Sequence, residues 1–278
     1  ESGYANVNFK AQFGLQSRSL PRYNMLSQDE FVEITWEALR NSSYYAGNSM
    51  ADAGAYASSA LSAQLGGEFY NPYKNYTWET LVDPATGKIK SDAKAAWNED
   101  WMDILTNHKA YRQDYQVGIT GGTEKTRYNL SAEYLDDRGV LITTKFDRYS
   151  IRGGVDHNVT KWMQVGGNLS YSYTDSNSSQ YSSTQTGNAW YTAQFMAPIY
   201  PVYLKDDNGK DALDENGQRQ YDYGTNGRPK AARFNVVGDL YENHYRTKAD
   251  NASIRSYANF GGNDPVMGAL KGLRFSVH

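Results

Sequence analysis

The four histidines are the side chains of this chain best suited to metal binding or proton transfer, and they are widely separated. They stand at His108, His157, His244 and His278, so no two have the i, i+4 spacing that places paired imidazoles on one helical face. No serine, histidine and aspartate arrangement suggests a hydrolase. The chain has no cysteine, which excludes disulfide scaffolds and thiolate zinc sites. We therefore predict no catalytic residues, no metal and no cofactor.

A short acidic stretch, DDNGKDALDENG at residues 206–217, is the strongest candidate for a calcium site. Its oxygen ligands would come from Asp206, Asp207, Asn208, Asp211 and Asp214. The EF-hand pattern fails, because Asp211 occupies the position where the loop needs glycine for its sharp turn. Asn-Gly pairs at 208–209 and 216–217 instead predict two hairpin turns. Hairpin chemistry is the preferred interpretation, and calcium stays open as the alternative.

Aromatic side chains are the most numerous groups that could bind a ligand. The chain has 24 Tyr, 6 Trp and 9 Phe, although its mean hydropathy is −0.75. Aromatic faces can stack on sugar rings, and several aromatics follow position 175 among small polar residues. The candidates for contact with a substrate or a lipoprotein are Trp190, Tyr191, Phe195, Tyr200, Tyr203, Tyr221 and Tyr223. The alternative is that these aromatics only pack the segment together.

Charge and hydropathy exclude several classes of protein. The 28 Lys and Arg residues against 31 Asp and Glu give a net charge of −3, so no basic field points to a nucleic acid. No run approaches the roughly 18 apolar residues of a membrane-spanning helix. The opening residues ESGYANVNF lack the basic start and apolar stretch of a signal peptide, so we expect a mature or internal segment.

Strict alternation of apolar and polar residues predicts β-strands in seven places. In VNFKAQFGLQ, for example, Val7, Phe9 and Phe13 share one face, and Lys10 and Gln12 share the other. The predicted strands cover residues 7–16, 111–120, 127–134, 148–156, 163–174, 248–261 and 273–278. The polar faces of the second to fifth strands carry Arg112, Arg127, Asn129, Glu133, Arg148, Arg152 and Asn168. Neither face has the dense aliphatic composition of a soluble sandwich interior.

The connections between these strands alternate between short and long. Residues 121–125, 158–161 and 262–271 make short turns, whereas residues 17–110 and 175–246 make long loops. This asymmetry is typical of an outer-membrane barrel, whose apolar face meets lipid and whose polar face lines a watery lumen. Several tyrosines on the apolar face stand near the long-loop ends, as in the aromatic girdle of such a barrel: Tyr111, Tyr134, Tyr149, Tyr171 and Tyr173.

Helices are expected only inside the long loops. Ser27 and Glu30 form a capping box ahead of an amphipathic stretch at residues 31–38, and a second helix is expected over residues 92–105. The predicted fold class is all-β: a partial antiparallel transmembrane β-barrel of about seven strands, with long extracellular loops that contain short helices. A soluble β-sandwich with a tyrosine-rich surface is the alternative.

Two long segments resemble the barrel of SusC/RagA-type TonB-dependent transporters of Bacteroidota. They are VGITGGTEKTRYNLSAEYLDDRGVL at residues 117–141 and FDRYSIRGGVDHNVTKWMQVGGNLSYSYT at residues 146–174. Shorter pieces are similar to other parts of that pattern, in the same order: LSQDEFVEITWEA, NEDWMDIL, APIYPVYLKDDNGK, YDYG and LKGLRFSVH. The GGTEKTRY turn with the strand that follows it is fairly specific, whereas the loops are not.

This resemblance implies a barrel of about 22 strands, occluded by an N-terminal plug and energised by TonB. It also implies import of an oligosaccharide or oligopeptide across the outer membrane, together with a SusD-like surface lipoprotein. We expect residues 1–278 to be the N-terminal part of such a barrel, with the plug and the remaining strands absent. The expected partners are the lipoprotein, the TonB complex acting through the plug, the imported ligand and outer-membrane lipid.

Two other functions stay open at the level of the sequence. A soluble carbohydrate-binding or adhesive β-sandwich module would use the same aromatic residues without a membrane. A barrel enzyme, such as an outer-membrane lipase or protease, would need a Ser, His and Asp arrangement that the sequence does not offer. Transport by a protein that is not an enzyme is the function that the sequence favours.

Overall fold

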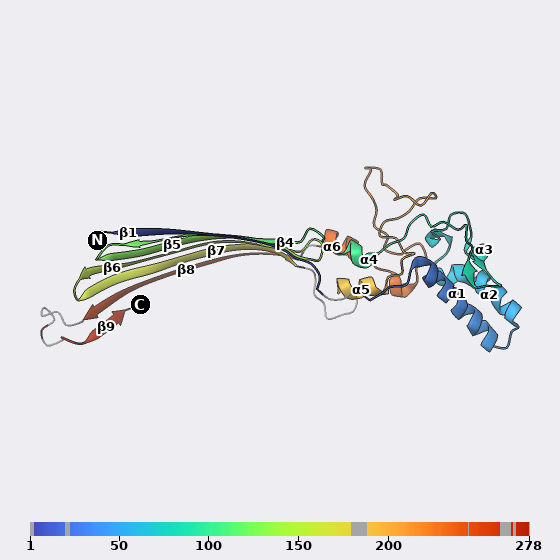
Figure 1. Cartoon of the computed structure of the whole chain (residues 1–278), viewed down its shortest axis with the longest axis horizontal. Helices are drawn as coiled ribbons and strands as arrows, with labels where there is room; N and C mark the ends of the chain where they lie inside the picture. Colours follow the sequence, from blue (N-terminus) through green and yellow to red (C-terminus); the bar gives the residue numbers. More distant parts are fainter. Residues whose placement is uncertain are drawn as a thin grey trace. The chain divides into compact units, whose positions relative to one another are not determined.

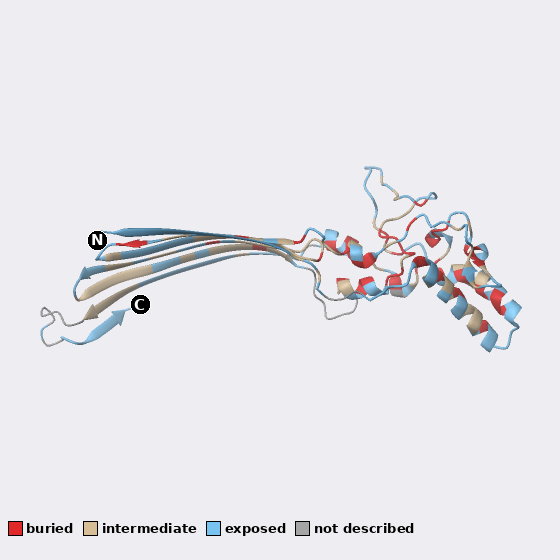
Figure 2. Ribbon diagram, in the orientation of Figure 1, coloured by how far each residue is buried: buried red, intermediate tan, exposed pale blue. Residues whose placement is uncertain are grey.

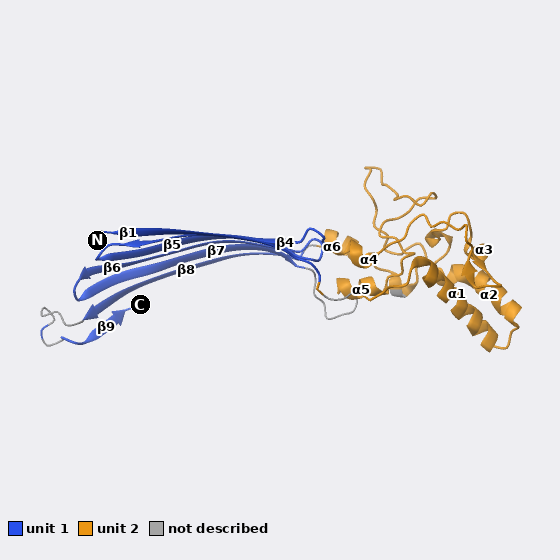
Figure 3. Ribbon diagram, in the orientation of Figure 1, with its two compact units in different colours: residues 1–18, 107–179, 244–278 blue, residues 19–106, 180–243 orange. Residues whose placement is uncertain are grey.

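The structure is a computed structural model of the chain, and it describes residues 3–19, 23–178, 188–243, 245–261, 268 and 271–277. The chain forms two compact units, coloured separately in Figure 3. Residues 1–18, 107–179 and 244–278 make the sheet unit, and residues 19–106 and 180–243 make the helical unit. The strands predicted from alternation therefore belong to the first unit, and the two long connections build the second.

The sheet unit is a single antiparallel sheet with the strand order β1-β4-β5-β6-β7-β8-β9 (Figure 1). Its strands are β1 (Tyr4–Leu15), β4 (Tyr111–Gly122), β5 (Thr126–Arg138), β6 (Lys145–Thr160), β7 (Met163–Ser178), β8 (Tyr245–Gly261) and β9 (Arg274–Val277). All seven predicted strands are confirmed, each within a few residues of its expected bounds. The predicted turn at 262–271 lies almost wholly outside the described residues.

The strands are unusually long, and the described residues of the sheet unit form no second layer over them. β6 and β7 have 16 residues each and β8 has 17, which is over 50 Å at about 3.3 Å per residue. Strands of globular proteins usually have about 3–10 residues. Among the described apolar residues of this unit, only Ala110, Leu135 and Leu141 are buried, and most of the sheet is exposed or half-buried in Figure 2. A soluble sandwich, which needs two sheets packed face to face, is therefore disfavoured.

The helical unit is richer in helix than expected, so "all-β" is too narrow a class for this chain. Its elements are α1 (Gln28–Tyr45), α2 (Met50–Leu65), the 3₁₀ helix η1 (Glu68–Tyr70), α3 (Trp78–Leu81), β2 (Val82–Asp83), β3 (Lys88–Ile89), α4 (Trp101–Ile104), α5 (Ala189–Phe195), the 3₁₀ helix η3 (Lys230–Ala232) and α6 (Val236–Glu242). Among the described residues, no helix is both long and apolar enough to cross a membrane.

Helix α1 begins as its capping box predicts. The Ser27 hydroxyl accepts a hydrogen bond from the Glu30 amide at 3.3 Å, and the Glu30 carboxylate accepts one from the Ser27 amide at 2.8 Å. Val32 and Trp36 of α1 are buried, as are Ala57 and Leu61 of α2. Apolar contact between the two helices, made close by the small residues of α2, therefore forms a core that the sheet unit lacks.

The second predicted helix, over residues 92–105, is wrong except for its last turn. Only α4 is helical there, and it starts where the Asp100 side chain accepts a hydrogen bond from the Asp103 amide at 3.0 Å. Ahead of it, the amide of Ala96 donates to the carbonyl of Pro72 at 2.8 Å, a pairing with a distant segment that a helix does not allow. The long second helix is instead α2, which follows Ser49 and ends at Gly66 with a φ of 95°.

Candidate functional site

Strand register gathers the apolar side chains of the sheet on one face. A representative cross-strand row consists of Val7, Ile119, Leu130, Gly153, Leu169 and Ile254. Among the described residues of the sheet unit nothing covers this face: Val7 is 63% exposed and Ile254 is 81% exposed. Such a large apolar surface requires something apolar against it.

A row of tyrosines borders this apolar face toward the longer connections. Tyr115, Tyr134, Tyr149 and Tyr173 are direct cross-strand neighbours on β4 to β7. Their ring centroids are separated by 6.5, 4.8 and 6.3 Å in turn. Of the tyrosines expected in a girdle, Tyr134, Tyr149 and Tyr173 stand in this row, and Tyr171 lies one row closer to the middle of the sheet.

The opposite face of the sheet is polar. It carries all seven residues proposed for a lumen: Arg112, Arg127, Asn129, Glu133, Arg148, Arg152 and Asn168. Arg148 forms an ion pair with Glu133, and Arg112 Nη1 lies 3.2 Å from Asp137 Oδ2. Register thus groups these residues on one surface, while their exposure to a lumen stays a prediction.

Two glycines leave room for polar contacts on this face. A Cβ atom at Gly154 would lie 2.6 Å from Asn168 Oδ1 and 2.9 Å from Asn129 Nδ2, so the absence of a side chain lets these amides approach from both flanking strands. At Gly166, a Cβ atom would lie 2.5 Å from the Tyr257 ring. The Tyr257 hydroxyl donates to Asp156 over this glycine. These two glycines therefore let polar side chains of the flanking strands approach one another on this face.

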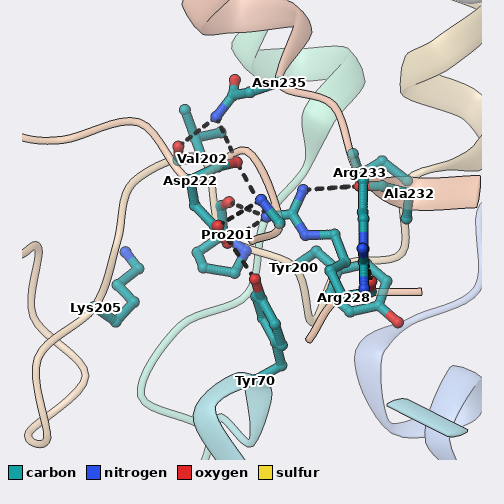
Figure 4. A network of polar contacts seen from close by, with 12 residues as sticks. Tyr70, Tyr200, Pro201, Val202, Lys205, Asp222, Arg228, Ala232, Arg233 and Asn235 are labelled. Carbon is teal, nitrogen blue, oxygen red and sulfur yellow. Dashed lines mark hydrogen bonds and ion pairs between the residues drawn. The ribbon is translucent and has the colours of Figure 1, made fainter. Parts of the chain in front are cut away.

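The helical unit is organised around one fully buried arginine, Arg228 (Figure 4). Its guanidinium pairs with the equally buried carboxylate of Asp222. It also donates to four backbone carbonyls at 3.2–3.3 Å, those of Pro201, Asp222, Ala232 and Phe234. Asn235 binds the same segments, because its side-chain nitrogen donates to the carbonyls of Val202 and Asp222.

Two tyrosines enclose the Arg228 guanidinium. The rings of Tyr70 and Tyr200 lie 5.4 and 5.2 Å from its central carbon. Burial raises the pKa of Tyr70 to about 12, assisted by the negative charge of Asp222. Burial likewise raises the pKa of Tyr200 to about 12. Both phenols therefore stay neutral at physiological pH, and this cluster fixes backbone positions instead of offering a reactive group.

Four of the seven aromatic candidates for ligand contact are tyrosines that contact other side chains of the helical unit. Tyr200 is buried beside Arg228, so its ring is not available to a ligand. Tyr203 is stacked on Tyr221 with ring centroids 5.1 Å apart, and the Arg219 guanidinium covers Tyr203 at 4.0 Å. The hydroxyl of Tyr223 donates to Glu242 at 2.9 Å. Tyr203, Tyr221 and Tyr223 are half-buried, so their contact with a ligand stays a prediction beside the packing alternative.

Of the seven candidates, the two that are exposed to solvent lie on helix α5. Its first turn is capped by Asn188, whose side-chain oxygen accepts hydrogen bonds from the amides of Trp190 and Tyr191 at 3.1 Å. Tyr191 and Phe195 are in contact at i, i+4 spacing, with centroids 4.6 Å apart, and Phe195 is 63% exposed. Trp190 is half-buried. The exposed pair of Tyr191 and Phe195 is therefore the best remaining candidate for contact with a ligand or a protein.

A cavity of about 520 Å³ lies on another side of α5. It is lined by residues 23–27, residues 98–102, Ala193, Met196 and Pro198. Its walls combine thioethers and an indole with the polar groups of Asn98, Glu99 and Asp100. The lining residue Trp101 is held by a hydrogen bond from its Nε1 to the Tyr200 carbonyl, and Trp97 Nε1 donates to the Ile199 carbonyl, each at 2.9 Å.

The acidic segment forms the two turns that Asn-Gly pairs predict. Asp206 Oδ1 accepts hydrogen bonds from the amides at 208 and 210, and Asp214 Oδ1 accepts from those at 216 and 218. Gly209 and Gly217 have φ values of 78° and 74°, as such turns require. Within the described part of the chain, no three His, Asp or Glu side chains are grouped closely enough to hold a metal ion.

Comparisons with known proteins agree with this two-faced sheet. No protein-family model matches the chain. A TonB-dependent receptor of Formosa agariphila is 31% identical over 110 residues, which are 39% of this chain and 10% of the receptor. The TonB-dependent receptor SusC of Bacteroides thetaiotaomicron is 33% identical over 86 residues, which are 31% of this chain and 8% of SusC. Part of this chain is homologous to SusC-type TonB-dependent receptors.

The solved structures extend this similarity over most of the fold. A chain in the structure of the RagAB peptide transporter superposes with a TM-score of 0.54 and 19% identity, covering 91% of this chain and 26% of that one. The seven-stranded sheet thus resembles part of the RagA barrel. The SusC/RagA relatives are transporters, and this chain corresponds to only about a tenth to a quarter of their length.

Sequence reasoning missed the Arg228 cluster. Nothing distinguishes Arg228 in the sequence, because its partners are mostly backbone carbonyls brought together from distant segments. The turn signal was present in YDYGTNGRP, where Gly224 and Gly227 have φ values of 78° and 110°. A Cβ atom at Gly224 would lie 3.0 Å from the Arg228 side chain, so glycine is needed there to admit the arginine.

Proposed function

We propose that this chain forms part of the outer-membrane barrel of a TonB-dependent importer. The observation that carries the proposal is the two-faced sheet, in which exposed apolar rows cover one face and polar side chains cover the other. In a membrane barrel the first face meets lipid and the second faces water. A single layer of this kind is stable only when lipid covers its apolar side and further strands remove its edges.

The height of the apolar band supports this proposal. On β7 the band runs from Val165 to Tyr173, which is eight residue steps or about 27 Å along the strand. A strand tilt of 35–45° reduces this to roughly 20 Å across the membrane, close to the apolar height of about 25 Å in outer-membrane barrels. The tyrosine row would then lie at the membrane surface, where aromatic side chains are enriched.

The direction of insertion follows from the connections. The turn at 123–125 and the two-residue turn between β6 and β7 would face the periplasm, and the helical unit, built from the long connections, would lie outside the cell. Homology to TonB-dependent receptors supports energised import as the activity. The ligand would be an oligosaccharide or an oligopeptide, and a SusD-like lipoprotein would assist its capture.

Two groups of residues would contact the ligand on its way. On the outside, Tyr191 and Phe195 offer exposed aromatic faces that could stack on a sugar ring or pack against a lipoprotein. Along the lumen, Asn129 and Asn168 would offer hydrogen bonds, beside the charges of Arg127 and Arg152. TonB would act through the plug of the full-length protein.

Uptake by intact cells tests the proposal. Cells carrying the full-length parent protein should accumulate its ligand in a TonB-dependent manner, and a strain without the gene should not. The double variant Tyr191→Ala/Phe195→Ala should lower uptake at equal surface abundance. Tyr56→Ala, which removes a 50% exposed aromatic from α2, is the matched control and should leave uptake unchanged. TonB-independent activity of the parent would contradict the proposed function.

A further inference from the structure

Six charged side chains form a connected group on the apolar face of the sheet, beyond the tyrosine row. Three aspartates, Asp136, Asp147 and Asp175, are direct cross-strand neighbours on β5, β6 and β7. They lie two residues beyond Tyr134, Tyr149 and Tyr173 along the same strands. The next row outward contains the three cations, Arg138, Lys145 and Arg246. We refer to these six residues as the charged belt.

Ion pairs connect the belt across four strands. Arg138 Nη2 lies 3.0 Å from Asp136 Oδ1 and 3.3 Å from Asp147 Oδ1. Lys145 Nζ bridges to Asp147 Oδ2 at 3.1 Å and to Asp175 Oδ2 at 3.3 Å. Arg246 closes the row, with its Nε donating to Asp175 Oδ1 at 2.7 Å. Each aspartate is thus paired with at least one cation, and the cations are held at fixed positions.

Exposure separates the two signs of charge. The carboxylate side chains are only 10–13% exposed, whereas Arg138, Lys145 and Arg246 are 29%, 30% and 49% exposed. An approaching molecule therefore meets guanidinium and ammonium groups, with the aspartates behind them. Lys248 extends the belt, because it is exposed and is the cross-strand neighbour of Asp175. Asp250, the exposed cross-strand neighbour of Tyr173 on the same face, balances the charge of Lys248, so attraction for an anion comes from the exposure of the cations and not from a net charge.

The cations keep donors available for an anion. An arginine has five N–H groups and a lysine three, more than the ion pairs of the belt require. Guanidinium groups bind phosphate through paired hydrogen bonds, so two arginines flanking a lysine suit a phosphate ester better than a neutral ligand.

We propose that the charged belt binds the phosphate groups of lipid headgroups in the outer leaflet of the outer membrane. This rests on the proposed function, because only a membrane-embedded sheet presents this face to lipid. The apolar rows would lie among acyl chains and the tyrosine row at their upper boundary, so the next row outward reaches headgroup depth. The aspartates orient the cations, and lipid phosphate completes their hydrogen bonding from the membrane side.

Lipid retention by the full-length protein tests the assignment. The purified protein, depleted of lipid in detergent, would be given a phosphorylated lipid A, the same lipid A without phosphate, or inorganic phosphate. We expect the phosphorylated lipid alone to be retained and to raise the thermal unfolding temperature. Arg138→Gln/Arg246→Gln should weaken its retention by about tenfold or more, through the loss of charge-assisted hydrogen bonds. Arg127→Gln/Arg152→Gln, which removes two positive charges from the polar face, is the charge-matched control and should retain it fully.

A second variant distinguishes loss of lipid binding from destabilisation of the protein. Asp175→Asn/Arg246→Gln removes both members of one pair, so it leaves no unpaired carboxylate and does not change the net charge. We expect it to fold and still to lose retention. Equal retention by wild type and both belt variants, equal retention of lipid A without phosphate, or the same stabilisation by inorganic phosphate would each overturn the proposal. Absence of the wild-type protein from the outer-membrane fraction would instead contradict the proposed function.

Discussion

At the scale of single residues, the buried pair of Arg228 and Asp222 determines how the helical unit holds its irregular segments. Both side chains are fully buried, and a charge in such a position is tolerated only when it is paired and hydrogen-bonded. The arginine binds carbonyls from residues 201 to 234, which regular secondary structure does not connect. Of the two tyrosines beside it, Tyr200 is one of the candidates for ligand contact, and its ring is buried there.

Removal of Arg228 should strongly destabilise the helical unit. Arg228→Met leaves Asp222 buried without its cation, which typically costs about 3–5 kcal/mol. Limited proteolysis of the full-length protein should show faster cleavage between residues 196 and 243. Arg219→Met is the matched control, because Arg219 is 54% exposed and surface ion pairs contribute about 0–1 kcal/mol. Equal cleavage of the two variants would contradict a structural role for Arg228.

The same cluster should make the helical unit sensitive to alkali. The pKa of Tyr70 and that of Tyr200 are each raised to about 12 from an ordinary value near 10, so the folded unit holds these protons more tightly than the unfolded chain. This stabilisation is complete below pH 10 and is lost as the pH rises from 10 to 12. The free energy of unfolding, monitored by tryptophan fluorescence, should therefore fall between pH 10 and pH 12. Tyr70→Phe should make this fall smaller. Full ionisation of all tyrosines near pH 10 without unfolding would argue against this.

At the scale of elements, strands were predictable and helices only partly so. Alternation with period two is a local property, and it fixed all seven strands and both faces of the sheet. The capping box located α1 because it too is local. Helix α2 was missed since MADAGAYASSALSAQL has little apolar periodicity, although its alanines, its Ser49 cap and Gly66 were available signals. The helix expected at 92–105 failed because Trp97 and Ala96 bind distant backbone.

The two faces of β5 should respond differently to charge. Leu130 is 49% exposed on the apolar face, so Leu130→Arg would place a cation in the lipid core at a cost of roughly 2–4 kcal/mol. Asn129→Arg, one residue away on the polar face, should cost far less because water reaches that side. Urea titration of the full-length protein folded into lipid vesicles measures both changes. A larger loss for Asn129→Arg would mean that the assignment of the faces is inverted.

At the scale of the whole molecule, the architecture results from long connections between strands that are neighbours in the sheet. Residues 16–110 separate β1 from its partner β4, and residues 179–244 separate β7 from its partner β8. These two connections together form the helical unit, where the indoles of Trp97 and Trp101 donate hydrogen bonds to the carbonyls of Ile199 and Tyr200. Contacts between residues about a hundred positions apart leave no mark in a single sequence, so the candidate cavity beside α5 could not be predicted from it.

The central claim is that the sheet crosses the outer membrane with its short turns inside and the helical unit outside. Thr123→Cys in the β4–β5 turn and Glu215→Cys in the second acidic turn introduce labelling sites at exposed positions, in a full-length background from which any cysteine outside these 278 residues has been removed. The decisive measurement is labelling of the full-length protein on intact cells with a membrane-impermeant thiol reagent. Labelling at 215 in intact cells, and at 123 only after the outer membrane is permeabilised, is the predicted result. Labelling at 123 but not at 215 in intact cells would contradict the account.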